Sequence, residues 1–359
     1  MEHKKNEMQD QQAEMKDKHA ENGIGRRTFL KTMGVAALGI GASALPISPR
    51  FVQLARAQQP CEGENYGGCR IVVFGSDSLR IDYAKEMWNG GQVTEESPAL
   101  SRLNEPICAT CGGLSSTQPG WASIWSGLPS EKIKCWANGR FEAMPAGFHI
   151  VEKLAKPEAY GENLYIVWIT GKGHNIMGSD PESPHHAVYK LIMENGQPGI
   201  YLGDEGRTDV EVLEAAGLAL EELKYQENFI CFIHFRNPDH KGHQVAGEVN
   251  DYTKYMNKAR AVDKKIYELM GMLPPDTDII YCSDHGFDFQ SQGDPRDAHK
   301  FSPYGMLATN FDTLPKTDVS QMTIGRLIYK RAGGNPDCTT KNNGTLYRMF
   351  GEDLVEGLL

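Results

Sequence analysis

Three aspartate-containing segments of this 359-residue chain could hold a metal ion, and two of them also contain histidine. Asp77 lies between two serines, residues 239–243 read Asp-His-Lys-Gly-His, and Asp284 precedes His285 in Ser-Asp-His-Gly. Carboxylates and imidazoles together are the ligands of Zn, Mn or Fe rather than of Ca. A single Asp-His pair is usually part of a turn. Three such segments in one chain indicate a metal site.

Thr117 is the candidate nucleophile. It opens the segment Thr-Gln-Pro-Gly, which is followed by small and aromatic residues and predicts the start of a helix. The free amides and the dipole at a helix start favour an oxyanion. The ordinary role of such a threonine is to cap the helix. The two roles are compatible, because coordination of the hydroxyl to a metal ion would lower its pKa and make it a nucleophile.

Four short apolar runs predict buried strands, since each is bounded by residues that favour turns. They are residues 70–75, 164–170, 229–235 and 278–282. Helical apolar spacing occurs at residues 210–225, with Asp209 as the expected N-cap, and at residues 252–273. This alternation predicts an α/β fold with a doubly wound, mainly parallel sheet flanked by helices. The region after Phe301 is rich in loop residues and gives no clear prediction.

The carboxyl ends of the predicted strands carry the aspartates. Asp77 follows the first strand, Asp239 the third and Asp284 the fourth. In doubly wound sheets, functional groups gather beyond these ends. We therefore expect the three aspartates and their neighbouring histidines to meet at one edge of the sheet.

Four motifs resemble those of a known enzyme group. Residues 72–80 resemble a hydrophobic-x-x-Asp-Gly-x-Arg segment, and residues 117–128 resemble Thr-x-Pro followed after six residues by Thr-Gly-Leu. Residues 239–243 and 283–286 match Asp-x-x-Gly-His and Ser-Asp-His-Gly. Together they resemble the alkaline phosphatase superfamily, especially its nucleotide pyrophosphatase/phosphodiesterase-like branch with a threonine nucleophile. The resemblance covers most of residues 70–300.

The resemblance implies two divalent metal ions. The first would be held by Asp77, Thr117, Asp284 and His285, and the second by Asp239, His243 and His299. His299 is placed by the fold of the family more than by a motif, and His234 and His240 are the other histidines near the third strand. Zn is favoured by the histidine-rich set, with Mn as the alternative. Thr117 would attack phosphorus to give a phospho-threonine, and Asn138 would contact a phosphoryl oxygen.

The type of ester depends on a further segment. Residues 171–174, Gly-Lys-Gly-His, resemble the sulfatase Gly-Lys-Trp-His segment, whose lysine and histidine contact sulfate oxygens. A surface turn is the alternative interpretation. Sulfatases require a cysteine or serine that is converted to formylglycine within Cys/Ser-x-Pro-x-Arg, whereas this chain has Thr117 and Trp121 at the first and last positions. A sulfatase is therefore disfavoured.

Lys172 and His174 instead favour a doubly charged phosphate monoester. Phosphodiester or pyrophosphate hydrolysis is the close alternative, because a diester needs less positive charge and more room. A non-catalytic metal-binding protein is a third hypothesis, against which Thr117 argues. The formal net charge of -10 excludes a general nucleic-acid-binding surface and leaves a small phosphate ester as the expected ligand.

The N-terminus resembles an export signal. Arg26 and Arg27 precede Thr-Phe-Leu-Lys, an apolar run covers residues 33–45, and Ala-Arg-Ala at residues 55–57 fits a signal-peptidase site. The apolar run is too short and glycine-rich for a stable membrane anchor. We expect residues 1–57 to be a cleaved twin-arginine signal, which would engage the twin-arginine export machinery. Residues 58–359 would form one catalytic domain in the periplasm or outside the cell.

The eight cysteines fall into two groups. Cys231 and Cys282 lie in apolar strand-like runs and are expected to be buried free thiols. The other six lie in loop-like contexts, where an oxidising compartment favours structural disulfides. These are Cys61, Cys69, Cys108, Cys111, Cys135 and Cys338.

Overall fold

The computed structural model describes residues 66–111, 115–248, 250–289, 302–311, 317–334, 339–342 and 345–348. All of them fall within one unit, Ala57–Leu359. The predicted leader, residues 1–57, lies outside the described residues, as do His299, Cys61 and Cys338. No helix in the described ranges is both long enough and apolar enough to cross a membrane.

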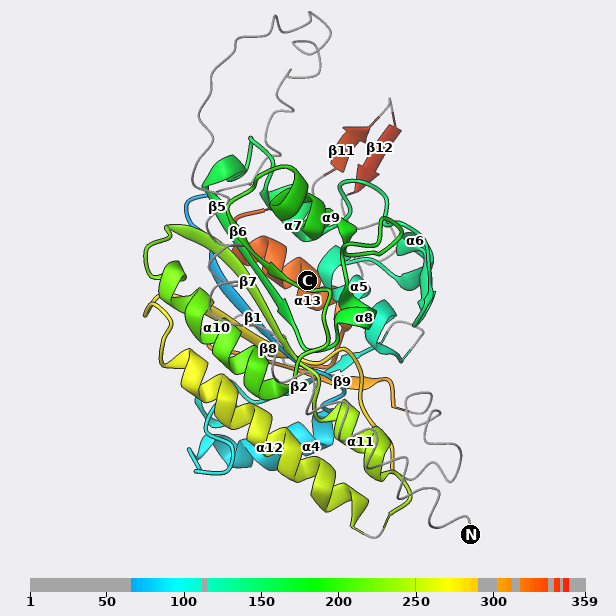
Figure 1. Cartoon of the computed structure of the whole chain (residues 1–359), viewed down its shortest axis with the longest axis vertical. Helices are drawn as coiled ribbons and strands as arrows, with labels where there is room; N and C mark the ends of the chain where they lie inside the picture. Colours follow the sequence, from blue (N-terminus) through cyan, green and yellow to red (C-terminus); the bar gives the residue numbers. More distant parts are fainter. Residues whose placement is uncertain are drawn as a thin grey trace, which may run out of the picture. The chain divides into compact units, whose positions relative to one another are not determined.

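The four predicted strands form the centre of an eight-stranded sheet with the order β10-β2-β9-β8-β1-β7-β5-β6 (Figure 1). Each of the four agrees with its prediction to within one residue at either end. Their bounds are β1 (Arg70–Ser76), β5 (Leu164–Thr170), β7 (Asn228–Phe235) and β8 (Asp278–Cys282). They run parallel to one another. The predicted fold class is confirmed.

The outer strands make the sheet mixed. They are β2 (Ile107–Thr110), β6 (Gly199–Leu202), β9 (Tyr304–Thr309) and β10 (Val319–Ser320). β9 is antiparallel to both of its neighbours, β2 and β8. It lies in the region after Phe301, for which no clear prediction was possible because a six-residue run that contains a glycine carries little periodicity.

Helices cover both faces of the sheet, because side chains alternate along each strand. Ile71 and Val73 of β1 point into one apolar layer, and Val72 and Phe74 point into the other. The first layer includes side chains of α5 (Thr117–Ser126), α7 (Ile150–Leu154) and α13 (Gln321–Arg331). The second includes side chains of α4 (Ile81–Trp88), α10 (Asp209–Leu223) and α12 (Asp251–Met270). Figure 1 shows the two groups of helices on opposite sides of the strands.

Shorter elements connect this framework. The short α-helices are α6 (Ser130–Ile133), α8 (Gly173–Ile176), α9 (His186–Tyr189) and α11 (Asp239–Val245). The remaining helical turns are η1 (Asn89–Gly91), η2 (Leu100–Arg102), η3 (Gly161–Asn163) and η4 (Lys190–Glu194). Two hairpins lie outside the main sheet, β3 (Cys135–Ala137) with β4 (Arg140–Phe141) and β11 (Thr339–Asn342) with β12 (Thr345–Arg348).

Two helix starts differ from prediction by one residue. The N-cap of α10 is Thr208, not Asp209: its hydroxyl accepts a hydrogen bond from the Glu211 amide, and the Glu211 carboxylate accepts one from the Thr208 amide. This reciprocal pair satisfies two amides at once, which a cap at Asp209 would not do. α5 begins at Thr117 as expected, but Ser116 is the N-cap. Thr117 is thus the first helical residue, and its hydroxyl is not used as a cap.

The predicted disulfides are wrong for the cysteines that the structure describes. Cys69, Cys108, Cys111 and Cys135 are free thiols, as are Cys231 and Cys282, for which this was expected. Cys108 lies on β2 and Cys111 directly follows it, so their side chains leave the strand on opposite faces. Cys69 and Cys135 pack into the apolar layer beside α5. Burial, rather than cross-linking, accounts for these positions.

Gly120 gives a test of how α5 is placed. A Cβ at this position would lie 2.6 Å from the Asp284 carbonyl oxygen and 2.9 Å from the Asp284 Cβ. Gly120→Ala must therefore push α5 away from the end of β8. We expect a loss of about 1–3 kcal/mol in the free energy of unfolding, measured by urea denaturation.

Gly217→Ala in α10 is the matched control, because its nearest neighbour atom, Met272 Cε, would lie 3.8 Å away, an ordinary contact. Alanine is favoured over glycine in a helix, so this variant should be as stable as the wild type or slightly more stable. Equal unfolding midpoints for Gly120→Ala and the wild type would contradict the close approach of α5 to Asp284.

Candidate active site

The ends of four parallel strands meet at one edge of the sheet. Asp77 follows β1, Lys172 lies two residues after β5, Asp239 begins α11 after β7, and Asp284 follows β8 by two residues. Backbone hydrogen bonds extend past the strand ends: the Asp77 amide donates to the Phe235 carbonyl at 3.1 Å, and the Asp239 amide donates to the Asp77 carbonyl at 3.1 Å. The strand register therefore holds the aspartates side by side, as the sequence predicted.

Asp77, Asp284 and His285 form a buried cluster. One ligand atom from each lies within 4.8 Å of the others, and it is the one such group of three or more found among the described residues. His285 Nε2 is 3.6 Å from Asp77 Oδ1 and 3.2 Å from Asp284 Oδ2. His285 Nδ1 donates to the Gly286 carbonyl at 2.9 Å, so in the neutral ring Nε2 carries the lone pair. Burial lowers the pKa of His285 and keeps the ring neutral.

This cluster fits a divalent cation. Asp77 Oδ1 and Asp284 Oδ2 are buried, and neither accepts a hydrogen bond from a described residue. Burial, together with the neighbouring Asp77, raises the pKa of Asp284 well above its usual range. Two buried carboxylates and an imidazole lone pair that face one another are costly unless positive charge lies between them. Carboxylate and imidazole donors suit Zn or Mn.

Thr117 completes this part of the site. Its side chain is buried, and Oγ1 lies 3.4 Å from His285 Nε2. Lys172 Nζ donates a hydrogen bond to the same oxygen at 3.2 Å. All four ligands predicted for the first metal ion are therefore in one place.

The second predicted metal site is described in part. Asp239 and His243 lie one turn apart on α11, with His243 Nε2 3.5 Å from Asp239 Oδ1. The third predicted ligand, His299, lies outside the described residues. His234, an alternative to His299 in the sequence analysis, contacts Asp77 of the first site instead. Its Nε2 lies 3.1 Å from Asp77 Oδ2, and both side chains are fully buried.

Lys172 joins the two halves of the site. Its Nζ lies 3.1 Å from Asp77 Oδ2 and 2.5 Å from Asp239 Oδ2. Burial would lower the pKa of Lys172, but the two carboxylates outweigh it and raise that pKa. Burial would likewise raise the pKa of Asp77, but Lys172 and the His234 hydrogen bond leave it lowered. Lys172 is thus a cation and a donor, and does not act as a base toward Thr117.

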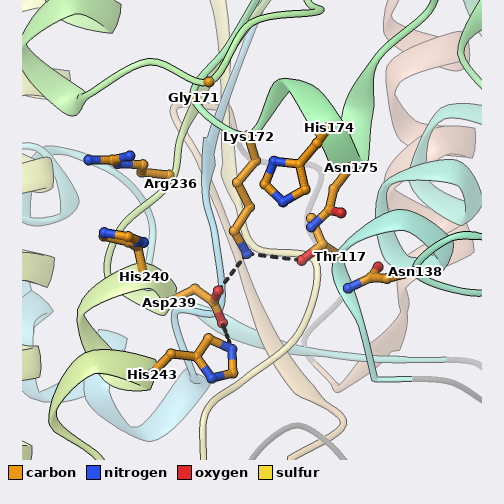
Figure 2. A pocket seen from close by; sticks show the side chains of 11 residues that line it. Thr117, Asn138, Gly171, Lys172, His174, Asn175, Arg236, Asp239, His240 and His243 are labelled. Atoms are coloured by element: carbon orange, nitrogen blue, oxygen red, sulfur yellow. Dashed lines mark hydrogen bonds and ion pairs between the residues drawn. The ribbon is translucent and has the colours of Figure 1, made fainter. Parts of the chain in front are cut away.

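A pocket of about 400 Å³ opens beside these residues (Figure 2). It is lined by six of the predicted site residues, which are Thr117, Asn138, Lys172, His174, Asp239 and His243. Asn138 Oδ1 accepts a hydrogen bond from the Gln118 amide at 2.8 Å, which leaves its NH₂ group toward the pocket. His174 is solvent-exposed, at the start of α8.

Four residues of the site were not assigned a role from the sequence. His234 Nε2 lies within hydrogen-bonding distance of Asp77 Oδ2, and Asn175, Arg236 and His240 line the pocket. One signal could have identified His234, because it is a histidine within an otherwise apolar strand. It follows Phe232 by two residues, so its side chain is on the face of the sheet that packs against α5. No periodicity marks Arg236 or His240, because Arg236 lies between β7 and α11 and His240 lies in the first turn of the short helix α11.

Comparison with known families identifies the chain. The profile of the type I phosphodiesterase / nucleotide pyrophosphatase family matches residues 71–301, more than half of the 359 residues. The chain belongs to this family. The matched region contains all seven predicted metal ligands, including His299. A search of curated proteins found no match to this phosphodiesterase-family chain.

Solved structures show the same fold. BT1596, a 2-O GAG sulfatase, is 14% identical with a TM-score of 0.53, over 81% of this chain and 74% of the sulfatase. A putative sulfatase from Bacteroides thetaiotaomicron VPI-5482 is 14% identical with a TM-score of 0.52, over 75% of this chain and 71% of the other. At this identity the similarity concerns the fold alone. Family and fold together confirm the resemblance to the alkaline phosphatase superfamily.

The contact between His234 and Asp77 predicts an effect on metal affinity. A hydrogen-bonded neighbour orients a metal ligand, and its removal typically costs about 10- to 100-fold in affinity. His234→Leu should weaken Zn binding by that order in a calorimetric titration, whereas His234→Gln, which keeps an N–H donor, should recover part of it. His186→Gln is the control, since His186 lies on α9 and hydrogen-bonds the Gly178 carbonyl. Wild-type affinity in a folded His234→Leu protein would refute the role.

Proposed function

We propose that this protein is an exported, two-metal phosphoester hydrolase that acts on phosphate monoesters through a phospho-threonine intermediate. The observation that carries the proposal is the position of Thr117. Its hydroxyl lies at the start of α5, 3.4 Å from His285 Nε2 and 3.2 Å from Lys172 Nζ. A protein that only stores metal gains nothing from a buried hydroxyl there, so a non-catalytic role is disfavoured.

Metal ions would be held by the two ligand sets. The first set is Asp77, Thr117, Asp284 and His285, and the second is Asp239, His243 and His299. When bound, two divalent ions supply positive charge that makes the threonine hydroxyl more acidic and stabilises the attacking and departing oxygens. The predicted identity is Zn, with Mn as the alternative.

The chain's own residues then perform the transfer. Thr117 Oγ1 forms a bond to phosphorus as the bond to the ester oxygen breaks, and the leaving group departs as an alcohol after taking up a proton. Water then cleaves the Thr117–phosphate bond, which releases inorganic phosphate and restores the hydroxyl. The Thr117 backbone amide and the NH₂ group of Asn138 would donate hydrogen bonds to the non-bridging oxygens.

Lys172 supports the monoester assignment. A phosphoryl group bonded to Thr117 Oγ1 must lie next to the Lys172 ammonium, which is 3.2 Å from that oxygen. A monoester dianion carries one more negative charge than a diester, so it gains more from this cation. His174, at the rim of the same pocket, is the second group proposed to contact the phosphoryl oxygens.

Phosphodiester or pyrophosphate hydrolysis is the second candidate. The family description over residues 71–301 favours it, and a pocket of about 400 Å³ has room for a second ester substituent. A sulfatase is disfavoured although sulfatases share the fold, because Thr117 stands where a cysteine or serine would be converted. The only support for export through the twin-arginine machinery is the sequence of residues 1–57.

Removal of the nucleophile gives the first test of this function. Thr117→Ala should lower hydrolysis of p-nitrophenyl phosphate by at least about 10³-fold, because the intermediate cannot form. Its metal content, measured by mass spectrometry, should remain largely that of the wild type, since three ligands of the first set remain. Asp284→Ala is the contrasting variant and should lose metal. Turnover that persists in Thr117→Ala would rule out the covalent mechanism.

Substitution of Lys172 separates the two ester classes. Lys172→Gln should reduce kcat/KM for p-nitrophenyl phosphate by about 10- to 100-fold more than for bis-p-nitrophenyl phosphate, the range for a hydrogen bond to a charged group. Comparing the two esters cancels any common effect on metal content. Lys134→Gln, which removes an exposed lysine paired with Glu142, should change neither value. A wild type that prefers the diester would favour the second candidate.

A further inference from the structure

Two cations line the pocket of a chain whose formal net charge is -10. They are Lys172 and Arg236, and three histidines lie beside them. Asp239 is the one acidic side chain among these lining residues. Such a wall favours an anionic ligand.

The two cations differ in what they contact. Lys172 is paired with Asp77 and Asp239. Arg236 has no carboxylate of a described residue within 4.0 Å, and its Nε is buried without a hydrogen-bond partner among the described residues. Arg236 itself is half-buried and lines the pocket. A buried N–H donor without a partner costs free energy, which a ligand that accepts its hydrogen bond would recover.

Close packing of two segments fixes the position of Arg236. A Cβ on Gly171 would lie 3.0 Å from the Arg236 amide nitrogen and 3.3 Å from the Arg236 Cβ. The Gly171 amide also donates to the His234 carbonyl at 2.8 Å. The segment after β5 and the segment after β7 are thus held against each other at the wall of the pocket, which fixes the backbone and Cβ of Arg236 there.

Arg236 and His240 lie across the pocket from the nucleophile. In Figure 2 their side chains are on one side, Thr117 and Asn138 are on the other, and Lys172 and Asp239 are between them. In an in-line displacement the leaving group departs on the side opposite the attacking oxygen. The leaving group of the substrate therefore faces Arg236 and His240.

His240 is arranged as a second donor. The Gln244 amide nitrogen lies 3.0 Å from His240 Nε2. An amide nitrogen can only donate, so Nε2 accepts and the neutral ring carries its proton on Nδ1. That N–H joins the guanidinium of Arg236 as a donor on this side of the pocket.

We propose that Arg236, assisted by His240, binds a second anionic group, a carboxylate or a phosphate, carried by the leaving group of the substrate. The planar guanidinium matches either group through two parallel hydrogen bonds. This inference rests on the proposed function and narrows its substrate class to phosphate esters whose alcohol product is itself an anion.

The test uses three series of alkyl phosphates that end in a carboxylate, a phosphate or a neutral amide, with chains of two to four carbon atoms. In the metal-loaded wild type, one of the two anionic series should have a kcat/KM above that of the amide series. Arg236→Gln should reduce this preference by about 10- to 100-fold, mainly through KM, since the lost hydrogen bonds are to a charged group. Arg236→Lys should retain part of the preference.

Lys241→Gln is the matched control. It removes the same charge from the helix that follows Arg236, but Lys241 does not line the pocket, so the preference should stay at the wild-type value. A wild type without preference for either anionic series would overturn the proposal. So would an Arg236→Gln protein that is folded and keeps the full preference. Which anionic series is preferred distinguishes a carboxylate from a phosphate.

A binding experiment separates this inference from the proposed hydrolysis. Calorimetry compares two anionic series, ω-carboxyalkyl phosphonates and alkane α,ω-bisphosphonates, with alkyl phosphonates of equal length; none of them can be hydrolysed at the P–C bond. The wild type should bind one of the two anionic series about 10- to 100-fold more tightly than the alkyl phosphonates, and Arg236→Gln should lose this difference. If the wild type hydrolyses no phosphate ester, the proposed function fails, and equal affinities for all three series would then show that the subsite fails as well.

Discussion

Buried negative charge at the carboxyl ends of β1, β7 and β8 is the constraint on which the site depends. Asp77, Asp239 and Asp284 are each at most 1% exposed. Charges in such an environment repel one another strongly, because little water remains to screen them. Lys172 contacts Asp77 and Asp239, while burial and the neighbouring Asp77 raise the pKa of Asp284 well above its usual range. Divalent cations are the physical solution that these residues fit.

The sheet is what keeps these charges together. β1 pairs with β7 on one side and β8 on the other, with Gly75 opposite both His234 and Cys282. This register aligns the strand ends, so the residues that follow them must converge. Two apolar layers bury almost every side chain of these strands, and Trp121 and Trp125 of α5 pack directly on one face. The stability of this core opposes the repulsion at its edge.

Within this fold, the type of ester that is bound depends on the side chains that line the pocket. The scaffold is shared with sulfatases of about 14% identity, so it does not by itself select an ester. Thr117 and Asn138 lie on one side of the pocket, and Arg236 and His240 lie on the other. Lys172 bridges them and neutralises carboxylates at the same time. In the proposed function, one pocket would combine groups for attack with groups that recognise the remainder of the substrate.

The sequence by itself determined the four central strands, the positions of α10 and α12 to within three residues, and the Asp-His motifs at the strand ends. Apolar periodicity and fixed motif spacing are local signals, and a parallel sheet brings strand ends together whatever the order of its strands. Tertiary structure alone decided that β9 joins the sheet antiparallel and that His234 contacts Asp77. Tertiary structure also placed Arg236 in the lining of the pocket. Each of these depends on which distant segments pack together, and no local pattern records that.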